Sequence, residues 1–409
     1  MSTTVAKNHT EDVVIIGAGA SGLSTADALR RLGICPLILE RSRKVAASWR
    51  TRHPQLRLNT HRWLSGLRGM PVPRSAGAFA SRDGIIDYLE RYAEATSARI
   101  CFGCEVAGIH RHGDHWQLKT SEGRIHARHV VIATGRERKP SVPEWPGLGQ
   151  WRGELLHSAD LGDVSRYEGK RVLVVGAGNS GTDVLNHLAS VRTRSLHVSV
   201  RQGSYFVPTR LLGFPVHLGA VVMTLLPLAV TDRLLAVTER IAFGDLARYG
   251  LPRKRQGAAS RLAREGVAPA IDNGFIRALK AGRVKVAGGV SRFDEDGVSL
   301  ADGQRLNPDI VIAATGYRPG LESLLGHLDI LDGAGLPRVG KTGESADVPT
   351  LWFAGMYPQL PGNFWVCRRS SGLMARAIRN RLRASAATGR AAAKANSRSS
   401  SPVTLAATD

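Results

Sequence analysis

The sequence predicts an α/β protein of two parallel-sheet domains, the second inserted into the first, and three observations support this prediction. An apolar run followed by G-x-G-x-x-G and a helix-type pattern occurs twice, at Val13 to Gly22 and at Val172 to Gly181. Two later apolar runs both end in Ala-Thr-Gly, at residues 133–135 and 314–316. A proline-rich link at residues 139–147 marks a boundary between the two units. A chain of 409 residues is long enough for two full-sized cores.

These signals set the expected domain boundaries. The N-terminus lacks the apolar stretch of a secretion signal, and the C-terminal residues are Ala, Ser, Arg and Thr without periodicity. We therefore expect a flexible N-terminus at residues 1–10, a first domain at 11–145 and 315–384, a second domain at 146–314 with an apolar helical insertion at about 205–270, and a disordered tail at 385–409.

Each glycine motif predicts a strand that turns sharply into a helix whose N-terminus faces a pyrophosphate, as in Rossmann-like dinucleotide-binding domains. The first glycine permits the turn, the second lets the backbone approach the phosphates, and the third lets the helix pack on the strand. The helix N-terminus supplies free N–H groups for the anion. The residues expected to hold the first dinucleotide are Gly17, Gly19, Ala20, Ser21 and Gly22, and those expected to hold the second are Gly176, Gly178, Asn179, Ser180 and Gly181.

The residues downstream of the two motifs differ, and they indicate different nucleotides. Glu40 lies 23 positions after Gly17, where an acid accepts hydrogen bonds from a ribose 2′-hydroxyl, so the first site suits FAD or NAD. Ser199 lies 23 positions after Gly176, in the place of Glu40, and Arg201 follows on the same strand face. A neutral residue beside a guanidinium fits the 2′-phosphate of NADP. A solvated arginine at a strand end is the alternative for Arg201.

Charge and cysteine content limit the partners. The formal net charge is +22 and the pI about 10.8, but most arginines are scattered and no nucleic-acid-binding motif accompanies the cluster at residues 253–255. We therefore expect no nucleic-acid partner and assign the charge to solubility and to attraction for anionic cofactors. Four cysteines are too few for a disulfide framework and fit the reducing cytoplasm. Cys101 and Cys104 have redox-motif spacing but precede a strand-like stretch, and with no second pair no metal site is expected.

The segment Leu211 to Val230 is almost uncharged and about long enough to span a bilayer. It contains two prolines and lies inside the second domain, so a buried or substrate-facing helical insertion is favoured over a membrane span. Weak peripheral membrane contact stays open, and so does the oligomeric state.

With these motifs in place, the chain resembles the flavin-containing monooxygenase superfamily over residues 11–383. The resemblance is carried by both glycine motifs, both Ala-Thr-Gly turns, Ser48-Trp49-Arg50, and the stretch from Trp151 to Leu161. That stretch matches the family fingerprint at Gly153 and His157 and departs from it at Trp151 and Leu161. The stretches at residues 243–252 and 316–318 are similar to the plant YUCCA-type indole-3-pyruvate monooxygenases.

The resemblance implies that FAD and NADPH are the cofactors and that O₂ and a small molecule are the substrates. In the family, NADPH reduces FAD, and a flavin C4a-(hydro)peroxide then delivers one oxygen atom. Asn59 matches a family asparagine that hydrogen-bonds near this peroxide and is the expected catalytic residue; an Asx-turn asparagine is the alternative. The further FAD contacts implied are Arg41, Trp49, Val106, Ala133, Thr134 and Gly135, and the further NADPH contacts are Ala314, Thr315 and Gly316.

Other functions with the same two-nucleotide plan remain open from the sequence. A Baeyer–Villiger monooxygenase acting on ketones is one, although the fingerprint is incomplete. An NADPH-dependent flavin or disulfide reductase is another, but a disulfide reductase needs a cysteine pair at the flavin. A non-catalytic redox sensor is the third. His61 and His157 are weaker site candidates, and each has a structural interpretation. The apolar insertion favours an aromatic or lipophilic substrate, with an indolic 2-oxo acid favoured by the YUCCA-like stretches.

Overall fold

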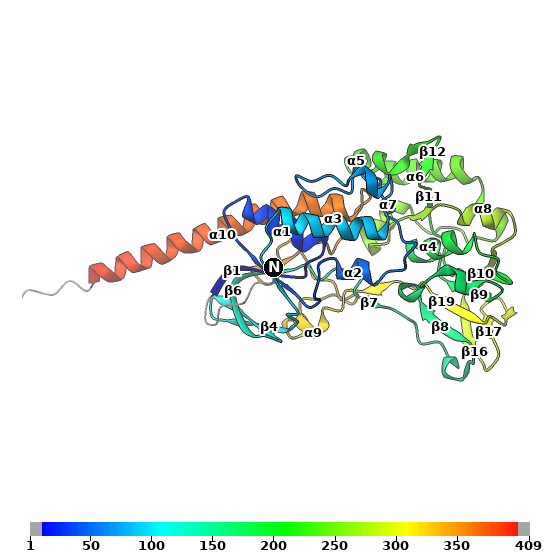
Figure 1. Cartoon of the computed structure of the whole chain (residues 1–409), viewed down its shortest axis with the longest axis horizontal. Helices are drawn as coiled ribbons and strands as arrows, with labels where there is room; N and C mark the ends of the chain where they lie inside the picture. The colour runs from blue at the N-terminus through cyan, green and yellow to red at the C-terminus, as the bar shows by residue number, and fades with distance from the viewer. Residues whose placement is uncertain (1–9, 400–409) are drawn as a thin grey trace, which may run out of the picture.

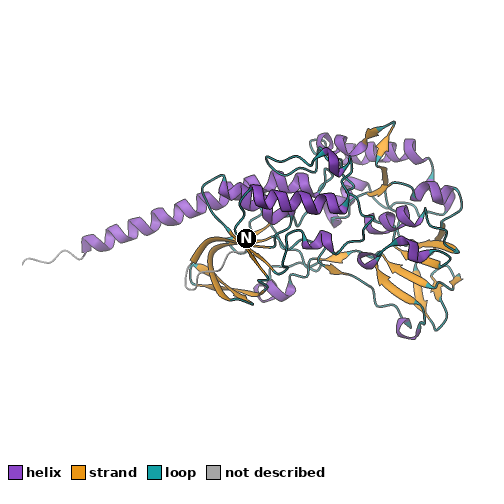
Figure 2. Ribbon diagram, viewed as in Figure 1, coloured by secondary structure: helices purple, strands orange, loops and turns teal. Residues whose placement is uncertain are grey.

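The computed structural model describes residues 10–399 and contains two α/β domains joined by short connections (Figure 1). The segment expected to be flexible, residues 1–10, lies outside the described residues except for Thr10, which begins the first strand. Each domain is built around one large sheet, accompanied by smaller strand pairings and covered by helices (Figure 2).

The first domain is built on a sheet whose parallel part has the order β3-β2-β1-β6, with β21 beside β6. The strands β4 and β5 extend β6 as an antiparallel meander. The strands are β1 (Thr10–Ile16), β2 (Leu37–Glu40), β3 (Ile100–Phe102), β4 (Val106–His112), β5 (His115–Thr120), β6 (Gly123–Ile132) and β21 (Leu351–Phe353). The helices are α1 (Ala20–Arg30), α2 (Ala47–Arg50), α3 (Arg82–Ala95), α9 (Glu322–Leu325) and α10 (Asn363–Ser399).

Both faces of this sheet are covered, which explains why its central strands are continuous apolar runs. On β1, Val13 and Ile15 pack with α1, α3 and α10, whereas Val14 and Ile16 pack with the meander and α9. Because successive side chains of a strand point to opposite faces, this one strand contributes to two cores.

The second domain has a five-stranded parallel sheet of order β15-β10-β9-β19-β8. A small antiparallel sheet, β16-β17-β18, packs beside it. The strands are β8 (Glu154–His157), β9 (Arg171–Val175), β10 (Ser195–Ser199), β15 (Lys285–Ala287), β16 (Val290–Phe293), β17 (Val298–Leu300), β18 (Arg305–Leu306) and β19 (Ile310–Ala313), and the helices are α4 (Asn179–Leu188) and α8 (Phe275–Lys280).

The order of strands along the chain confirms the predicted fold class. All five strands of the second sheet lie between β6 and β21, which belong to the first sheet, so the second domain is inserted into the first. The two chain segments that connect the domains pair with each other as antiparallel strands, β7 (Lys139–Pro140) with β20 (Tyr317–Arg318). The domain limits named from the sequence stay predictions, because they also depend on how the linking loops are divided.

The apolar insertion is not one long helix. Its flanks are held by a parallel pair of strands, and its middle is a hairpin followed by short and longer helices. The elements are β11 (Phe206–Pro208), β12 (Arg210–Leu211), β13 (Phe214–Pro215), α5 (Ala220–Met223), α6 (Leu228–Phe243), α7 (Ala258–Glu265) and β14 (Ala270–Asp272). Within residues 10–399, no helix has the length and apolar character needed to cross a bilayer.

The expectation of a disordered tail from residue 385 is wrong for part of that segment. Helix α10 runs from Asn363 to Ser399, and Figure 1 shows its later turns projecting beyond the rest of the molecule. The residues after 383 are rich in alanine, which has the highest helix propensity, so their composition favours continuing the helix that begins at Asn363. Residues 400–409 of the predicted tail lie outside the described residues.

Candidate functional site

The first glycine turn lies between β1 and α1 and leaves no room for side chains at two of its three glycines. Gly17 has φ +108°, and a Cβ there would lie 2.7 Å from the Ala133 carbonyl oxygen. A Cβ on Gly22 would lie 1.9 Å from the Gly17 carbonyl oxygen. A Cβ on Gly19 would meet no protein atom within 4 Å, so the space above it is open. This turn has the close packing and the open approach that a pyrophosphate site requires.

The second glycine turn, between β9 and α4, repeats this geometry. Gly176 has φ +110°, and a Cβ there would lie 2.6 Å from the Ala314 carbonyl oxygen. A Cβ on Gly181 would lie 1.9 Å from the Gly176 oxygen, and Gly178 again faces open space. Neither α1 nor α4 has a side-chain cap or an acidic residue in its first turn. Their N-terminal N–H groups are therefore available to an anion.

Glu40 is buried at the end of β2, beside the first glycine turn. Its Oε2 accepts a hydrogen bond of 2.7 Å from the Ala18 N–H, and its Oε1 accepts bonds from the Ser42 N–H and hydroxyl at 2.9 and 2.7 Å. A carboxylate offers about four acceptor positions, so one remains for a ribose hydroxyl. The fixed carboxylate repels a phosphorylated ribose.

In the second domain, the residue in the place of Glu40 is not Ser199, as residue counting predicted, but Val200. The Gly17 N–H bonds to the Leu39 carbonyl, and the equivalent Gly176 N–H bonds to the Ser199 carbonyl. Ser199 therefore matches Leu39. The connection from the second glycine motif to β10 is one residue longer than its counterpart, which shifts the register by one position. The side chain of Ser199 donates to the Gly288 carbonyl at 2.7 Å instead.

With the corrected register, the second site still lacks the carboxylate of the first, but the residue at that position is Val200 and not Ser199. Val200, 6% exposed, puts an apolar side chain where the first domain has a carboxylate. Arg201 follows at the exposed end of β10, in the register position of Arg41, and its side chain lies over Gly289. Among residues 10–399 no carboxylate lies within ion-pair distance of Arg201, so its guanidinium is free for a ligand.

The other residues expected around the first nucleotide lie on several elements. Ala133, Thr134 and Gly135 follow β6 against the glycine turn, and the buried Thr134 hydroxyl has no hydrogen-bond partner within the described residues. Ser21, also in the motif, contacts Cys367 of α10 through Oγ and Sγ at 3.1 Å. Trp49 is on α2 against Phe364, Arg41 is exposed beyond β2, and Val106 begins β4.

The contact between α1 and the start of α10 was not predicted from the sequence. Ser24 of α1 donates to the Cys367 carbonyl at 3.2 Å and to the Ser371 hydroxyl at 3.0 Å. A Cβ on Gly355, in the loop before α10, would lie 2.1 Å from the Ser21 hydroxyl. The segment at residues 355–371 therefore packs directly on the first glycine turn, and the run of small residues in α1 was the signal for it.

The residues expected around the second nucleotide are also brought together. Ala314, Thr315 and Gly316 follow β19 against the second glycine turn. Asn179 donates to the Pro269 carbonyl at 3.1 Å, while its buried side-chain oxygen has no partner among residues 10–399. Ser180 is half-buried at the start of α4.

His157 has a structural role beside this turn. Its Nε2 donates to the Gly316 carbonyl at 3.0 Å, and its Nδ1 accepts from the Ala159 N–H at 3.1 Å. Burial lowers the pKa of His157, although the bond to Gly316 opposes this shift. A neutral imidazole that bonds on both sides holds the loop in place.

A cavity of about 740 Å³ lies between the two domains and carries Asn59 in its wall. Asn59 is exposed to it, and its amide makes no hydrogen bond within the described part of the chain, so the Asx-turn alternative has no support. His61 lies nearby against Phe79, and burial followed by the charges of Arg62 and Arg210 lowers its pKa. The remaining wall combines apolar side chains with four cations, Arg57, Arg210, Arg277 and Lys280.

The cysteines do not form a redox pair. All four are free; Cys101 is buried within β3, and Cys104 is buried just after it. Burial, followed by the charge of Cys104, raises the pKa of Cys101 to about 11. A thiol with such a pKa is a poor nucleophile at neutral pH.

Comparisons with known proteins agree with this geometry. A family model described as "Pyridine nucleotide-disulphide oxidoreductase" matches residues 14–205. The chain is 34% identical over 330 residues to the probable indole-3-pyruvate monooxygenase YUCCA7 of Arabidopsis thaliana, an alignment that covers 78% of this chain and 76% of that protein. It is 32% identical over 317 residues to the indole-3-pyruvate monooxygenase YUCCA1 of Oryza sativa subsp. japonica, covering 76% and 78%.

Solved structures share the fold at lower identity. A flavin-containing monooxygenase from Stenotrophomonas maltophilia superposes with a TM-score of 0.69 at 24% identity and covers 91% of this chain and 99% of its own. An oxidized steroid monooxygenase bound to NADP superposes with a TM-score of 0.67 at 19% identity, covering 90% and 85%. Both likenesses support the arrangement of the two domains.

Proposed function

The chain belongs to the family of the YUCCA-type indole-3-pyruvate monooxygenases, which are flavin-containing monooxygenases, and from this membership we propose that it binds FAD in its first domain and NADPH in its second and inserts one atom of O₂ into a small apolar acid. The observation that supports the proposal is the pair of open glycine turns, the first with an acid beside it and the second with an arginine beside it. Glu40 suits an unphosphorylated ribose, and Val200 with Arg201 suits a 2′-phosphate.

Each protein group has a defined task in this proposal. When bound, the reduced flavin would supply the two electrons with which O₂ reacts. Amino-acid side chains cannot perform this chemistry. The two glycine turns bind the cofactors and orient them toward the space between the domains. Asn59, on the wall of the cavity, presents a neutral N–H donor that can hold activated oxygen without releasing a proton to it.

The walls of the cavity favour an aromatic 2-oxo acid over a neutral ketone or an amine. Phe79, Phe243 and Ile271 supply apolar surface, and the guanidinium groups suit a carboxylate. The two acids in the wall are both engaged: Asp272 accepts from the Ile276 N–H at 2.9 Å, and Asp183 is hydrogen-bonded to His53. With indole-3-pyruvate, one oxygen atom enters the shortened acid, the carboxylate leaves as CO₂, and NADPH and a proton reduce the other oxygen atom to water.

The test is a substrate panel under oxygen-uptake and peroxide readout. Indole-3-pyruvate, a tertiary amine, a thioether and a cyclic ketone are compared at equal concentration with FAD-loaded protein and NADPH. We expect the 2-oxo acid to give CO₂ in equal amount to the NADPH oxidised, with little H₂O₂. Faster turnover on the ketone would favour Baeyer–Villiger chemistry. NADPH oxidation without O₂ uptake would favour a reductase, and no oxidation at all would favour a sensor.

Replacing Asn59 by Asp should uncouple NADPH oxidation from oxygen transfer. The carboxylate cannot donate a hydrogen bond when ionised, and when protonated it supplies the proton that releases H₂O₂. We expect FAD content to be unchanged and most of the oxidised NADPH to appear as H₂O₂. The matched control is Asn273→Asp, which adds the same charge on another wall of the same cavity and should stay coupled. Coupling preserved in Asn59→Asp would remove Asn59 from the catalytic residues.

We also propose that the protein acts in the cytoplasm and contacts anionic membranes weakly through the insertion. Leu212, Leu225 and Ile241 are 100%, 80% and 68% exposed there. The acids of α6 point inward, since Asp232 accepts from Ala259 N–H at 2.7 Å and Glu239 from Phe206 N–H at 2.8 Å. The exposed charges on α6 itself are therefore basic, namely Arg233 and Arg240, whereas Arg248 beyond its end pairs with Asp245 at 3.7 Å. This surface complements an anionic bilayer, whereas a second copy with a charge of +22 would be repelled.

Vesicle flotation tests the membrane contact. We expect the protein to float with equimolar phosphatidylglycerol–phosphatidylcholine vesicles, and the double variant Leu225→Ser, Ile241→Ser to bind at least ~10-fold more weakly, because burying one such side chain contributes about 1.5–3 kcal/mol. Val142→Ser, which removes an exposed apolar side chain elsewhere, is the control. Equal binding of the double variant would contradict the proposal, and so would equal binding to phosphatidylcholine alone.

A further inference from the structure

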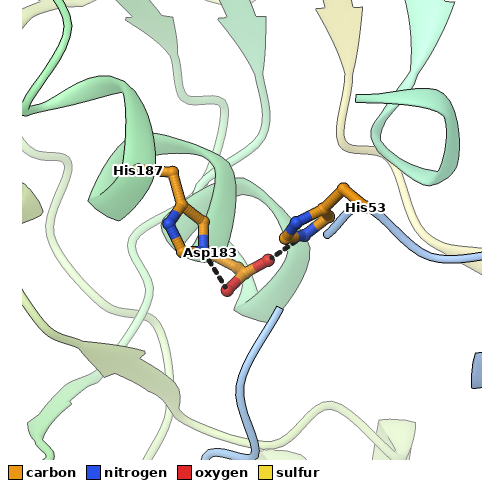
Figure 3. A group of neighbouring side chains, drawn as sticks. All are labelled: His53, Asp183 and His187. Carbon is orange, nitrogen blue, oxygen red and sulfur yellow. Dashed lines mark hydrogen bonds and ion pairs between the residues drawn. The ribbon is translucent and has the colours of Figure 1, made fainter. Parts of the chain in front are cut away.

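Three side chains with metal-ligand atoms converge where the two domains meet (Figure 3). His53 follows α2 in the first domain, and Asp183 and His187 lie one turn apart on α4 in the second. The distance is 2.9 Å from His53 Nε2 to Asp183 Oδ2 and 3.5 Å from His187 Nε2 to Asp183 Oδ1. We propose that His53, Asp183 and His187 bind one divalent transition-metal ion of the zinc class, which bridges the two domains.

The donor set is one that Zn²⁺ takes in proteins. Two imidazole nitrogens and one carboxylate oxygen leave a fourth tetrahedral position for water. The three ligand atoms all lie within 4.8 Å of one another, so a small shift of side chains brings each to bonding distance from a central ion. The four-residue spacing of Asp183 and His187 puts both on one face of α4.

The carboxylate of Asp183 lies between the two imidazoles, with one oxygen facing Nε2 of each ring (Figure 3). A divalent ion bound to one carboxylate keeps a net charge of about +1. Water in the fourth coordination position, which opens to the cavity, can solvate this charge.

The interdomain cavity provides the entry path. Asp183 and His187 line it, whereas His53 is only 4% exposed and forms the closed side of the site. The same cavity carries four cationic side chains, which repel a metal ion. Affinity must therefore come from coordination bonds, and we expect it to stay constant or rise when salt screens the arginines.

Gln55 determines which nitrogen of His53 carries the proton. With its amide turned to satisfy Gly162 and Val164, the Gln55 nitrogen lies 3.3 Å from His53 Nδ1. Nδ1 then accepts, and Nε2 donates to Asp183. Metal binding through Nε2 requires the ring proton on Nδ1 and a hydrogen-bond acceptor that faces this Nδ1–H group. Gln55→Glu supplies that acceptor, and we expect it to tighten metal binding by ~10-fold, since such outer partners change affinity about 10–100-fold.

A bridging ion would join the second glycine turn to the first domain. Asp183 lies four residues after Asn179, at the start of the same helix, so a bond from His53 to the shared ion restrains that helix directly. We expect the metal to raise the thermal midpoint of the FAD-loaded protein, because an ion bound only by the folded state stabilises it. Binding itself is measured without turnover.

The test titrates metal-stripped, FAD-loaded protein with Co²⁺ and follows its d–d absorption, then displaces it with Zn²⁺. We expect one Co²⁺ per chain with the strong bands of tetrahedral coordination, and at least a ~10-fold loss of affinity in His53→Gln and in His187→Gln. FAD content and the thermal midpoint of the stripped variants check that they fold.

A second histidine group gives the matched control. His112, His115 and His126 lie together on β4, β5 and β6, with ring centroids 5.1 Å apart from His112 to His115 and from His115 to His126. His115→Gln should leave the Co²⁺ spectrum and stoichiometry unchanged. A signal that survives His187→Gln, or one that disappears in His115→Gln, would overturn the proposal, and so would wild-type protein that binds no Co²⁺.

Discussion

Alanine at Gly22 should abolish FAD retention, and alanine at Gly181 should leave FAD bound while abolishing the use of NADPH. In each case the new Cβ would lie 1.9 Å from a backbone carbonyl oxygen, so the helix must move away from the strand that it follows. Overpacking of this kind costs about 1–3 kcal/mol or more and is concentrated on the pyrophosphate turn. The measurements are the flavin-to-protein absorbance ratio and the rate of anaerobic flavin reduction by NADPH.

Two further variants separate a binding effect from a folding effect. Gly19→Ala adds a Cβ that meets no protein atom, so the apoprotein should be as stable as wild type while FAD binds more weakly. Gly326→Ala also meets no protein atom and lies away from both turns, and it should change neither property. Full FAD content in Gly22→Ala, or equal FAD binding by Gly19→Ala and wild type, would contradict the assignment of the first turn.

Removing the side chain of Arg201 should lower kcat/KM for NADPH by ~10–100-fold and leave NADH little changed. A hydrogen bond to a charged group contributes about 1.5–3 kcal/mol, and only NADPH carries the 2′-phosphate that would receive it. Steady-state kinetics with both nucleotides measure the ratio. An equal loss for both would contradict the role of Arg201 in phosphate recognition.

The register of the two domains provides matched variants for this experiment. Arg41→Ala changes the arginine at the equivalent position of the first domain and should leave the NADPH-to-NADH ratio unchanged. Val200→Glu places a carboxylate where the first domain has Glu40 and should shift the preference toward NADH, because the acid repels the 2′-phosphate. If Val200→Glu kept the preference for NADPH, the register correspondence between Val200 and Glu40 would carry no functional meaning.

The sequence was sufficient for the fold class because the glycine turns are determined by local sterics. Gly17 and Gly176 adopt φ values that other residues rarely adopt, and the apolar strand before each is readable without tertiary information. The position of Ser199 was misassigned because counting residues ignores loop length, and one extra residue reverses the face to which a strand side chain points.

Other features depended on tertiary contacts that a single sequence does not display. His53 and Asp183 are 130 residues apart in the sequence, so no local motif predicts their contact. The contact of Ser21 with Cys367 joins residues 346 positions apart. The helical continuation of α10 to Ser399 has no periodic apolar signal in the sequence, and the alanine content of this segment favours a helix that begins upstream.

The insertion of one domain into the other has a consequence for biosynthesis. β21 pairs with β6 between Leu351 and Val130, across 221 residues (351 minus 130), and occupies the edge of β6 that β5 leaves uncovered. On the ribosome, all strands of the second sheet emerge before β21 does. The second domain can therefore fold first as a continuous unit. Until β21 emerges, the first domain is incomplete and exposes an apolar strand edge. In this state an emerging chain most needs a chaperone.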